Sequence, residues 1–154
     1  MAHKQEVGNN AIKDHMFGAN FFWNISDNVG YGYKNNESDV LLVQFFLNST
    51  VRAFNKYSEG KDVSTIVPDG KFGGQTWAKV KWFQTQVECV VDGMVSSPSG
   101  NSLFTPNQGQ IYTMYTFNAV YKRCFGHYYP DIRVDPKCPV PLRGHFTVPH
   151  DIFD

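Results

Sequence analysis

The sequence predicts an all-α fold, in which a three-helix core at residues 36–125 lies between irregular extensions at 1–35 and 126–154. Two observations predict this architecture. Apolar residues recur at helical spacing in three separate segments, and Asp-Gly turns with apolar flanks lie between those segments. A chain of 154 residues, of which 42% are hydrophobic and 18% charged, is large enough to bury a core of its own.

The N-terminal extension, residues 1–35, is rich in glycine and asparagine, which favours loops. One extended run is expected at residues 20–25, and the two extensions together allow a short β-ribbon. Tyr31 and Tyr33 alternate with glycines, and this composition suits either a binding loop or a plain linker.

The first helix is predicted to begin at Asn36 or Ser38, either of which can cap it, and to end near Tyr57. Its apolar residues cover several faces, namely Val40, Leu41, Leu42, Val43, Phe45, Phe46, Leu47 and Phe54. A helix that is apolar nearly all round must be covered nearly all round. Two kinds of cover are open: the chain's own end segments, or a protein partner, including self-association through this helix.

The second helix is predicted at residues 74–87, where one apolar stripe follows helical spacing: Thr76, Val80, Phe83 and Val87. Trp77 and Lys81 share another face of this helix, and Trp82 lies on a third. Either tryptophan can stack on a ligand or pack beneath the extensions, and packing is the favoured interpretation for Trp82.

The third helix is predicted at about residues 106–125, with Thr105 as its N-cap and Pro106 at its first position. Gly126 is a natural stop for this helix. The C-terminal extension contains five prolines, so it is expected to be extended, with a short strand near residues 144–148.

Two hexapeptides resemble each other, since residues 67–72 read VPDGKF and residues 90–95 read VVDGMV. Each places an Asp-Gly pair between apolar residues. Glycine adopts positive φ at no steric cost, and aspartate can accept hydrogen bonds from nearby backbone amides. Asp69 and Asp92 are therefore interpreted as turn-forming residues, in preference to a carboxylate pair for acid–base chemistry or calcium.

These motifs resemble the three-helix peptidoglycan-binding domain that accompanies many bacterial wall hydrolases. That family carries D-V-x-x-L-Q-x-x-L-N in its first helix, where residues 39–48 here read DVLLVQFFLN. It then carries D-G-x-F-G-x-x-T-x-x-A-V-x-x-F-Q, where residues 69–84 read DGKFGGQTWAKVKWFQ, and a second V-D-G follows at 91–93. The resemblance covers about residues 36–125, and residues 96–103 resemble an insertion.

The resemblance implies non-catalytic recognition of bacterial cell-wall peptidoglycan, through its glycan or its stem peptide. The expected site is a shallow groove near the Asp-Gly turns and the second helix, where amides hold carbonyls or carboxylates and aromatic rings supply contact area. The candidate ligand-binding residues are Asp69, Gly70, Lys71, Phe72, Gly73, Gln75, Trp77, Lys81, Asp92, Gly93, Tyr31 and Tyr33. The alternative function is a protein-interaction or structural module, such as a component of a phage particle or secretion apparatus, that reuses this fold.

Enzyme chemistry is not expected from the sequence. The five histidines form no HExxH or other compact metal motif, and no serine lies in G-x-S-x-G. No catalytic residue, metal or cofactor is therefore predicted. Cys89, Cys124 and Cys138 match no zinc spacing, so free thiols are the first interpretation and a Cys124–Cys138 disulfide is the second.

Charge and hydropathy narrow the classes of partner. The 14 Lys and Arg balance the 14 Asp and Glu, which argues against nucleic-acid binding. No stretch is long enough to span a membrane, and the first residues lack the apolar segment of a signal peptide. The chain is therefore expected to be cytoplasmic at synthesis, and a function at the wall would require delivery to the periplasm or cell wall by another route.

Overall fold

The computed structural model describes residues 1–57, 63–106 and 109–146. Over these residues the chain is mostly helical with one small two-stranded sheet, which confirms its predicted helical character. The elements, in chain order, are β1 (His3–Glu6), α1 (Asn10–His15), β2 (Phe21–Asn24), α2 (Glu37–Tyr57), α3 (Gly74–Gln86), α4 (Thr113–Phe125), the 3₁₀ turns η1 (Gly126–Tyr128) and η2 (Ile132–Val134), and α5 (Val140–His145).

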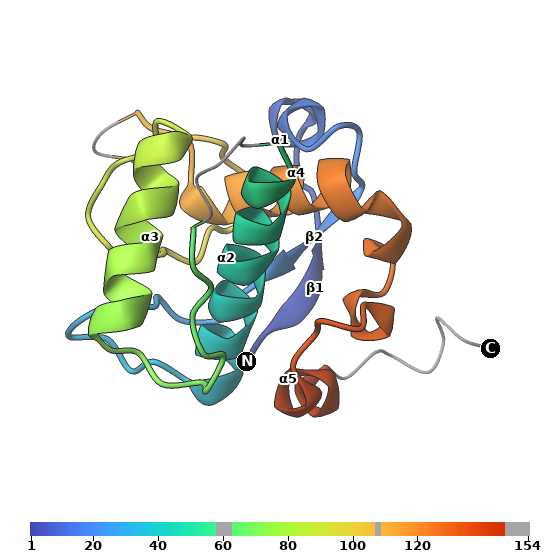
Figure 1. Cartoon of the computed structure of the whole chain (residues 1–154). Helices are drawn as coiled ribbons and strands as arrows, with labels where there is room; N and C mark the ends of the chain where they lie inside the picture. Colours follow the sequence, from blue (N-terminus) through green and yellow to red (C-terminus); the bar gives the residue numbers. More distant parts are fainter. Residues whose placement is uncertain (58–62, 107–108, 147–154) are drawn as a thin grey trace.

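Helix α2 is the centre of the fold, with α3 on one side, α4 behind it, and the β1–β2 pair and α5 on the other side (Figure 1). Every residue from Val40 to Leu47 is at most 1% exposed. The chain's own ends supply part of this cover, because α5 contacts α2 and the Ala2 amide donates to Ser38 Oγ at 3.0 Å. This corrects the expectation of self-association through an apolar face of α2, since that face is buried within the chain.

The N-terminal extension forms the sheet. Strand β1 pairs antiparallel with β2, in a register that runs from His3 opposite Asn24 to Glu6 opposite Phe21. The extended run expected at residues 20–25 is confirmed by β2, and the short β-ribbon that the two extensions allowed is the β1–β2 pair of the N-terminal one. The prediction of a loop for the rest of the extension is wrong at β1 and α1, because both elements have regular backbone hydrogen bonds.

The C-terminal extension is a series of short turns rather than an extended tail. Its prolines keep each piece short, but they permit η1, η2 and the single-turn helix α5. Gly144 and His145 belong to α5, so the strand expected at residues 144–148 is wrong there. Residues 147–148 lie outside the described part of the chain.

Two buried contacts fasten this extension to the rest of the fold. The Trp23 indole donates to the carbonyl of Tyr129 at 2.9 Å, which ties β2 to the end of η1. Asp135, which is fully buried, accepts from the Tyr121 hydroxyl at 2.7 Å and pairs with Arg52 at 3.3 Å. Burial raises the pKa of Tyr121, and its bond to this carboxylate raises it further.

Helix α4 begins at Thr113, so the predicted start at Pro106 and the predicted cap at Thr105 are wrong. Phe104 and Ile111 pair in an isolated antiparallel bridge, and the chain must therefore turn back between them. A Thr-Pro pair is a local helix signal, and here a longer-range pairing of the backbone overrides it.

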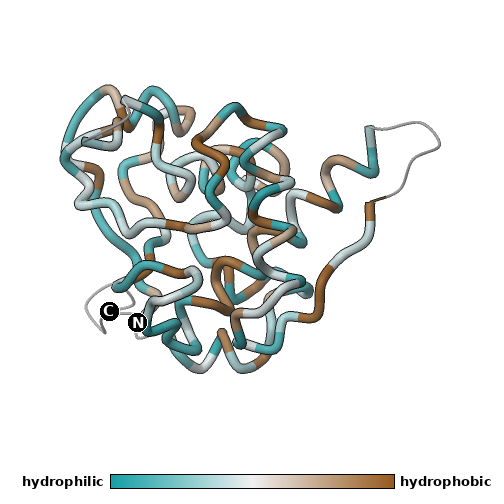
Figure 2. The backbone as a smooth tube through the Cα atoms, turned by 90° about the vertical axis from the view of Figure 1, so that its left-hand side faces the viewer, coloured by the Kyte–Doolittle hydropathy of each residue, from teal (hydrophilic) through white to brown (hydrophobic). Residues whose placement is uncertain are grey.

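The hydrophobic core draws on all parts of the described chain, from Ile12 and Phe22 through Phe46 to Leu142 and Phe146. The division of the chain at residues 36 and 125 stays a prediction. In Figure 2, short apolar stretches alternate with polar ones along the tube. Among the described residues, no helix has the length and hydropathy needed to cross a bilayer.

Candidate functional site

The first Asp-Gly corner is anchored by a buried glutamine of α2. Gln44 Nε2 donates to Asp69 Oδ1, to the Lys71 carbonyl and to Thr76 Oγ1, each at 3.1 Å. In return, Gln44 Oε1 accepts from the Gly70 amide at 2.9 Å. Gly70 lies at φ +75°, a conformation that glycine adopts without strain. The corner is thereby fixed to both α2 and the first turn of α3.

The carboxylate of Asp69 completes this corner. Its Oδ1 also accepts from the Lys71 amide at 2.9 Å. That bond, together with the one from Gln44, lowers the pKa of Asp69 because both stabilise the ionised form. The turn-forming interpretation of Asp69 agrees with these contacts.

The second Asp-Gly corner repeats the arrangement with a buried glutamine of α3. Gln84 Nε2 donates to Asp92 Oδ1 at 3.1 Å, to the Met94 carbonyl at 2.8 Å and to Thr113 Oγ1 at 3.2 Å. Its Oε1 accepts from the amides of Asp92 and Gly93, and Asp92 Oδ1 accepts from the Met94 amide at 2.9 Å. Gly93 lies at φ +74°, so the two corners have the same turn geometry.

The repeat extends to the residues beneath each glycine. Leu41 and Lys81 stand three positions before the anchoring glutamine, and Glu37 and Trp77 stand seven positions before it. In both corners a Cβ on the glycine would come within 3.3 Å of these side chains, and the closest would be Glu37 at the first corner and Trp77 at the second. The sequence motifs contain both glutamines, Gln44 within the first and Gln84 at the end of the second, but only the Asp-Gly pairs were recognised there as parts of the corners.

Four of the predicted residues gather in one exposed group, the aromatic cluster of Tyr31, Phe72, Trp77 and Lys81. The rings of Tyr31 and Phe72 meet edge to face at 5.0 Å between centroids, and Tyr31 lies 6.1 Å from Trp77. Lys81 Nζ lies over the Trp77 ring at 4.3 Å. Tyr31 is 57% exposed and Phe72, Trp77 and Lys81 are half-buried, so the cluster has a face open to solvent.

A small hollow adjoins the aromatic cluster at the first corner. It measures about 180 Å³ and is lined by Val67, Asp69, Lys71, Phe72, Gly73, Gly74, Gln75 and Thr76. Phe72 belongs to both features, which makes them neighbours. Gly73 is the N-cap of α3 and offers no side-chain hydrogen bond to it, so the amides of the first turn are open to an acceptor.

Four of the predicted residues lie outside both the aromatic cluster and the hollow: Tyr33, Gly70, Asp92 and Gly93. Tyr33 is 40% exposed, and no ring contact joins it to the aromatic cluster within the described residues. Asp92 faces a different cleft. Trp82 packs edge to face on Phe54 of α2 at 5.5 Å, in agreement with its interpretation as a packing residue, and it borders a third cleft with Lys79.

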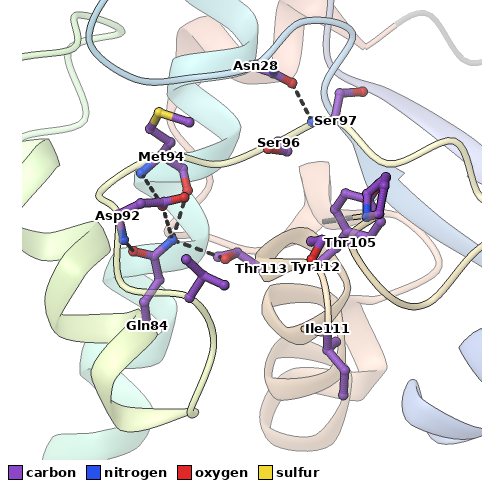
Figure 3. A pocket seen from close by; sticks show the side chains of 12 residues that line it. Asn28, Gln84, Asp92, Met94, Ser96, Ser97, Thr105, Ile111, Tyr112 and Thr113 are labelled. Carbon is purple, nitrogen blue, oxygen red and sulfur yellow. Dashed lines mark hydrogen bonds between the residues drawn. The ribbon is translucent and has the colours of Figure 1, made fainter. Parts of the chain in front are cut away.

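The largest of these openings is a polar cleft of about 400 Å³ at the second corner (Figure 3). It is lined by Asn28, Gln84, Val90, Asp92, Met94, Ser96, Ser97, Thr105, Pro106, Ile111, Tyr112 and Thr113. Of this set only Asp92 was predicted from the sequence. Most of the others lie between residues 84 and 113, and they come together with Asn28 only through the Phe104–Ile111 and Val29–Val95 bridges, which no local pattern reveals.

The described residues contain no group of three or more His, Cys, Asp or Glu placed to hold a metal ion. Cys89, Cys124 and Cys138 all lie in described segments and are free thiols, so the disulfide interpretation is wrong.

No family model, curated protein or solved structure matches this chain. The resemblance to peptidoglycan-binding domains therefore rests on the sequence motifs alone.

Proposed function

We propose that this chain recognises bacterial cell-wall peptidoglycan without catalysis, through the aromatic cluster and the adjoining hollow. The observation that carries the proposal is their adjacency. Of the twelve candidate residues, eight line one or both features: Tyr31, Asp69, Lys71, Phe72, Gly73, Gln75, Trp77 and Lys81. A flat aromatic surface and a polar hollow side by side suit a polymer that joins sugars to short peptides.

The two features supply different chemistry. The exposed ring of Tyr31 and the half-buried ring of Trp77 offer apolar surface to the carbon-bound hydrogens of a sugar. Lys71 and the open first turn of α3 offer positive charge and amide donors, which favour a carboxylate of a stem peptide. The proposed ligand therefore spans both, with its glycan on the rings and its peptide toward the hollow.

The electrostatics of the first corner support binding rather than hydrolysis. A glycosidase needs a carboxylic acid that stays protonated near neutral pH, which requires a raised pKa. The pKa of Asp69 moves in the opposite direction, because its hydrogen bonds favour the carboxylate. This carboxyl group is therefore suited to hold the corner and to accept hydrogen bonds.

The alternative, a protein-interaction or structural module such as a component of a phage particle or secretion apparatus, drew part of its support from the apolar surplus of α2. That surplus is packed inside the chain, where residues such as Phe45 and Phe46 are at most 1% exposed. This part of its support is thus accounted for by the core itself.

Sedimentation with purified peptidoglycan sacculi tests the proposal. The folded wild-type chain should pellet with sacculi, and Tyr31→Ala should weaken the apparent affinity about tenfold, since one stacked ring is worth about 1.4 kcal/mol. Tyr33→Ala is the matched control, because Tyr33 is also exposed and lies two residues away without joining the rings. It should bind within about twofold of wild type.

Two results would count against wall recognition. One is a wild-type chain that is folded by circular dichroism and does not pellet. The other is an equal loss of pelleting in Tyr31→Ala and Tyr33→Ala, which would separate binding from the aromatic cluster.

A further inference from the structure

The polar cleft at the second corner is built from three separate parts of the chain. In Figure 3, Asp92 and Met94 lie on one side, Thr105 and Tyr112 lie on the other, and Asn28 lies above. The volume, about 400 Å³, falls within the range that small-molecule sites occupy.

The walls of this cleft are held by the fold itself. Val29 and Val95 exchange backbone hydrogen bonds at 2.9 and 2.8 Å, which fixes the segment of Asn28 beside the segment that follows the corner. Asn28 Oδ1 accepts from the Ser97 amide at 2.8 Å. Gln84, which is 1% exposed, holds the corner side. A ligand would therefore meet groups already in place, which lowers the entropic cost of binding.

Several polar groups on these walls have no partner. Asp92 uses Oδ1 for its corner, and its Oδ2 has no hydrogen bond within the described residues. Asn28 Nδ2 and the hydroxyls of Ser96 and Tyr112 likewise form no hydrogen bond with residues 1–57, 63–106 or 109–146. The cleft thus presents acceptors, donors and hydroxyls that can each bond to a ligand.

The remaining lining decides the class of ligand. Its apolar part comes from Val90, Met94, Pro106, Ile111 and the ring of Tyr112. Asp92 is the one charged residue that lines the cleft among those described, so an anionic ligand would meet repulsion without a compensating cation. Hydroxyl-bonding groups beside apolar surface, without a basic residue, fit an uncharged ligand with many hydroxyls and apolar ring faces.

We propose that this cleft is a second binding site, which takes an uncharged saccharide unit. Asp92 accepts hydrogen bonds from sugar hydroxyls, Asn28 donates to a hydroxyl or an acetamido carbonyl, and the ring of Tyr112 contacts the sugar face. The inference goes beyond the proposed wall recognition, because it rests on a different opening and on different residues.

A matched pair of variants serves the test. Asp92→Asn removes the charge beside the cleft but keeps the Oδ1 acceptor that the corner needs, and Asp14→Asn makes the same change at an exposed position of α1 outside both openings. The full chain is titrated with the trisaccharides of N-acetylglucosamine, β-1,4-glucose and α-1,4-glucose, by calorimetry and by ¹⁵N amide shifts. At least one should saturate at millimolar concentration, with shifts centred on residues 92–97 and 112–113.

Asp92→Asn should weaken that binding at least about tenfold, while Asp14→Asn should stay within about twofold of wild type. The inference is overturned if no trisaccharide saturates, if the shifts centre on Tyr31 and Trp77, or if both variants weaken binding equally. Sacculus pelleting is scored separately. A chain that binds a trisaccharide in the cleft but does not pellet would refute wall recognition alone, and the reverse result would refute this site alone.

Discussion

The two Asp-Gly corners share their anchor and differ in what surrounds it. In each, a fully buried glutamine holds the aspartate, the glycine amide and the threonine of the next helix, with Gln44 at one corner and Gln84 at the other. Around the first corner the opening is about 180 Å³, and around the second it is about 400 Å³.

The length of the connection to the next helix explains the difference. After Gly70, helix α3 begins at Gly74, so the first corner leads directly into it. After Gly93, helix α4 begins only at Thr113, and the intervening chain pairs Val95 with Val29 before it turns back. The shared anchor thus ties each helix to the one that follows it, and the connection of variable length shapes the surface beside the corner.

Replacement of the anchors gives the largest expected effect. Gln84→Ala and Gln44→Ala should each lower the free energy of unfolding by about 3–4 kcal/mol, because each leaves several buried polar groups without a partner. Urea denaturation monitored by circular dichroism measures both. Gln86→Ala, at an exposed position of α3, is the control and should change stability by about 0.5 kcal/mol or less.

If the two glutamines contribute equally to stability, the falls in unfolding free energy in Gln84→Ala and Gln44→Ala should agree within about 1 kcal/mol. A large loss at Gln84 with almost none at Gln44 would mean that the first corner is held by its neighbours and not by its glutamine.

Alanine at the two corner glycines, in contrast, should lower the free energy of unfolding by different amounts. Gly93→Ala should cost about 2–3 kcal/mol, because positive φ is strained and the new Cβ would collide with the Trp77 ring. Gly70→Ala should cost about 1–2 kcal/mol, since its nearest atom, at 2.7 Å, is Cγ of the exposed Glu37, which can move. Thermal unfolding under matched conditions ranks the two variants.

Gly32→Ala isolates the cost of the backbone alone. Gly32 lies at φ +83° with nothing within 4 Å of an added Cβ, so about 1 kcal/mol is expected. Equal losses at Gly93 and Gly32 would show that the Trp77 ring yields freely, and the aromatic cluster would then be more mobile than its contacts indicate.

Sequence patterns predicted α2 and α3 well because both helices are defined by features in their own residues. The apolar positions of α2 cover all its faces, and the Asp-Gly pairs mark where the chain must turn. The prediction of the start of α4 was wrong for the opposite reason. Thr105 and Pro106 form a good local cap, but the pairing of Phe104 with Ile111 is a contact that no local pattern contains.

The candidate site likewise contains some residues that local patterns could predict and others that they could not. Phe72, Trp77 and Lys81 were found because they lie on or beside one helical motif. The contact between the rings of Tyr31 and Trp77 could not be predicted in this way. It depends on how the N-terminal loop returns to α3, and the spacing of residues along the sequence does not encode that path. The role of Gln84 was equally hidden, since a glutamine at the end of an amphipathic helix is most often a solvated residue.

The smallest expected effect concerns the charge of the first corner. Because the pKa of Asp69 is lowered in the folded chain, its ionised form adds stability that is complete above the ordinary carboxyl pKa of about 4 and is lost as pH falls through the folded value. Asp69→Asn keeps the acceptor atom and removes the charge. The gap in unfolding free energy between wild type and Asp69→Asn should therefore narrow between pH 6 and pH 3, as urea titrations can measure.

A ¹³C titration of the Asp69 carboxyl group checks the cause of this effect. Its strongest contribution comes from the backbone amide of Lys71, which no side-chain substitution removes, and the next comes from Gln44. The pKa of Asp69 in Gln44→Ala should thus rise part of the way toward its ordinary value. A complete return would show that Lys71 no longer donates and that the whole corner has opened, in which case the glutamine supports the turn itself as well as its attachment to α2.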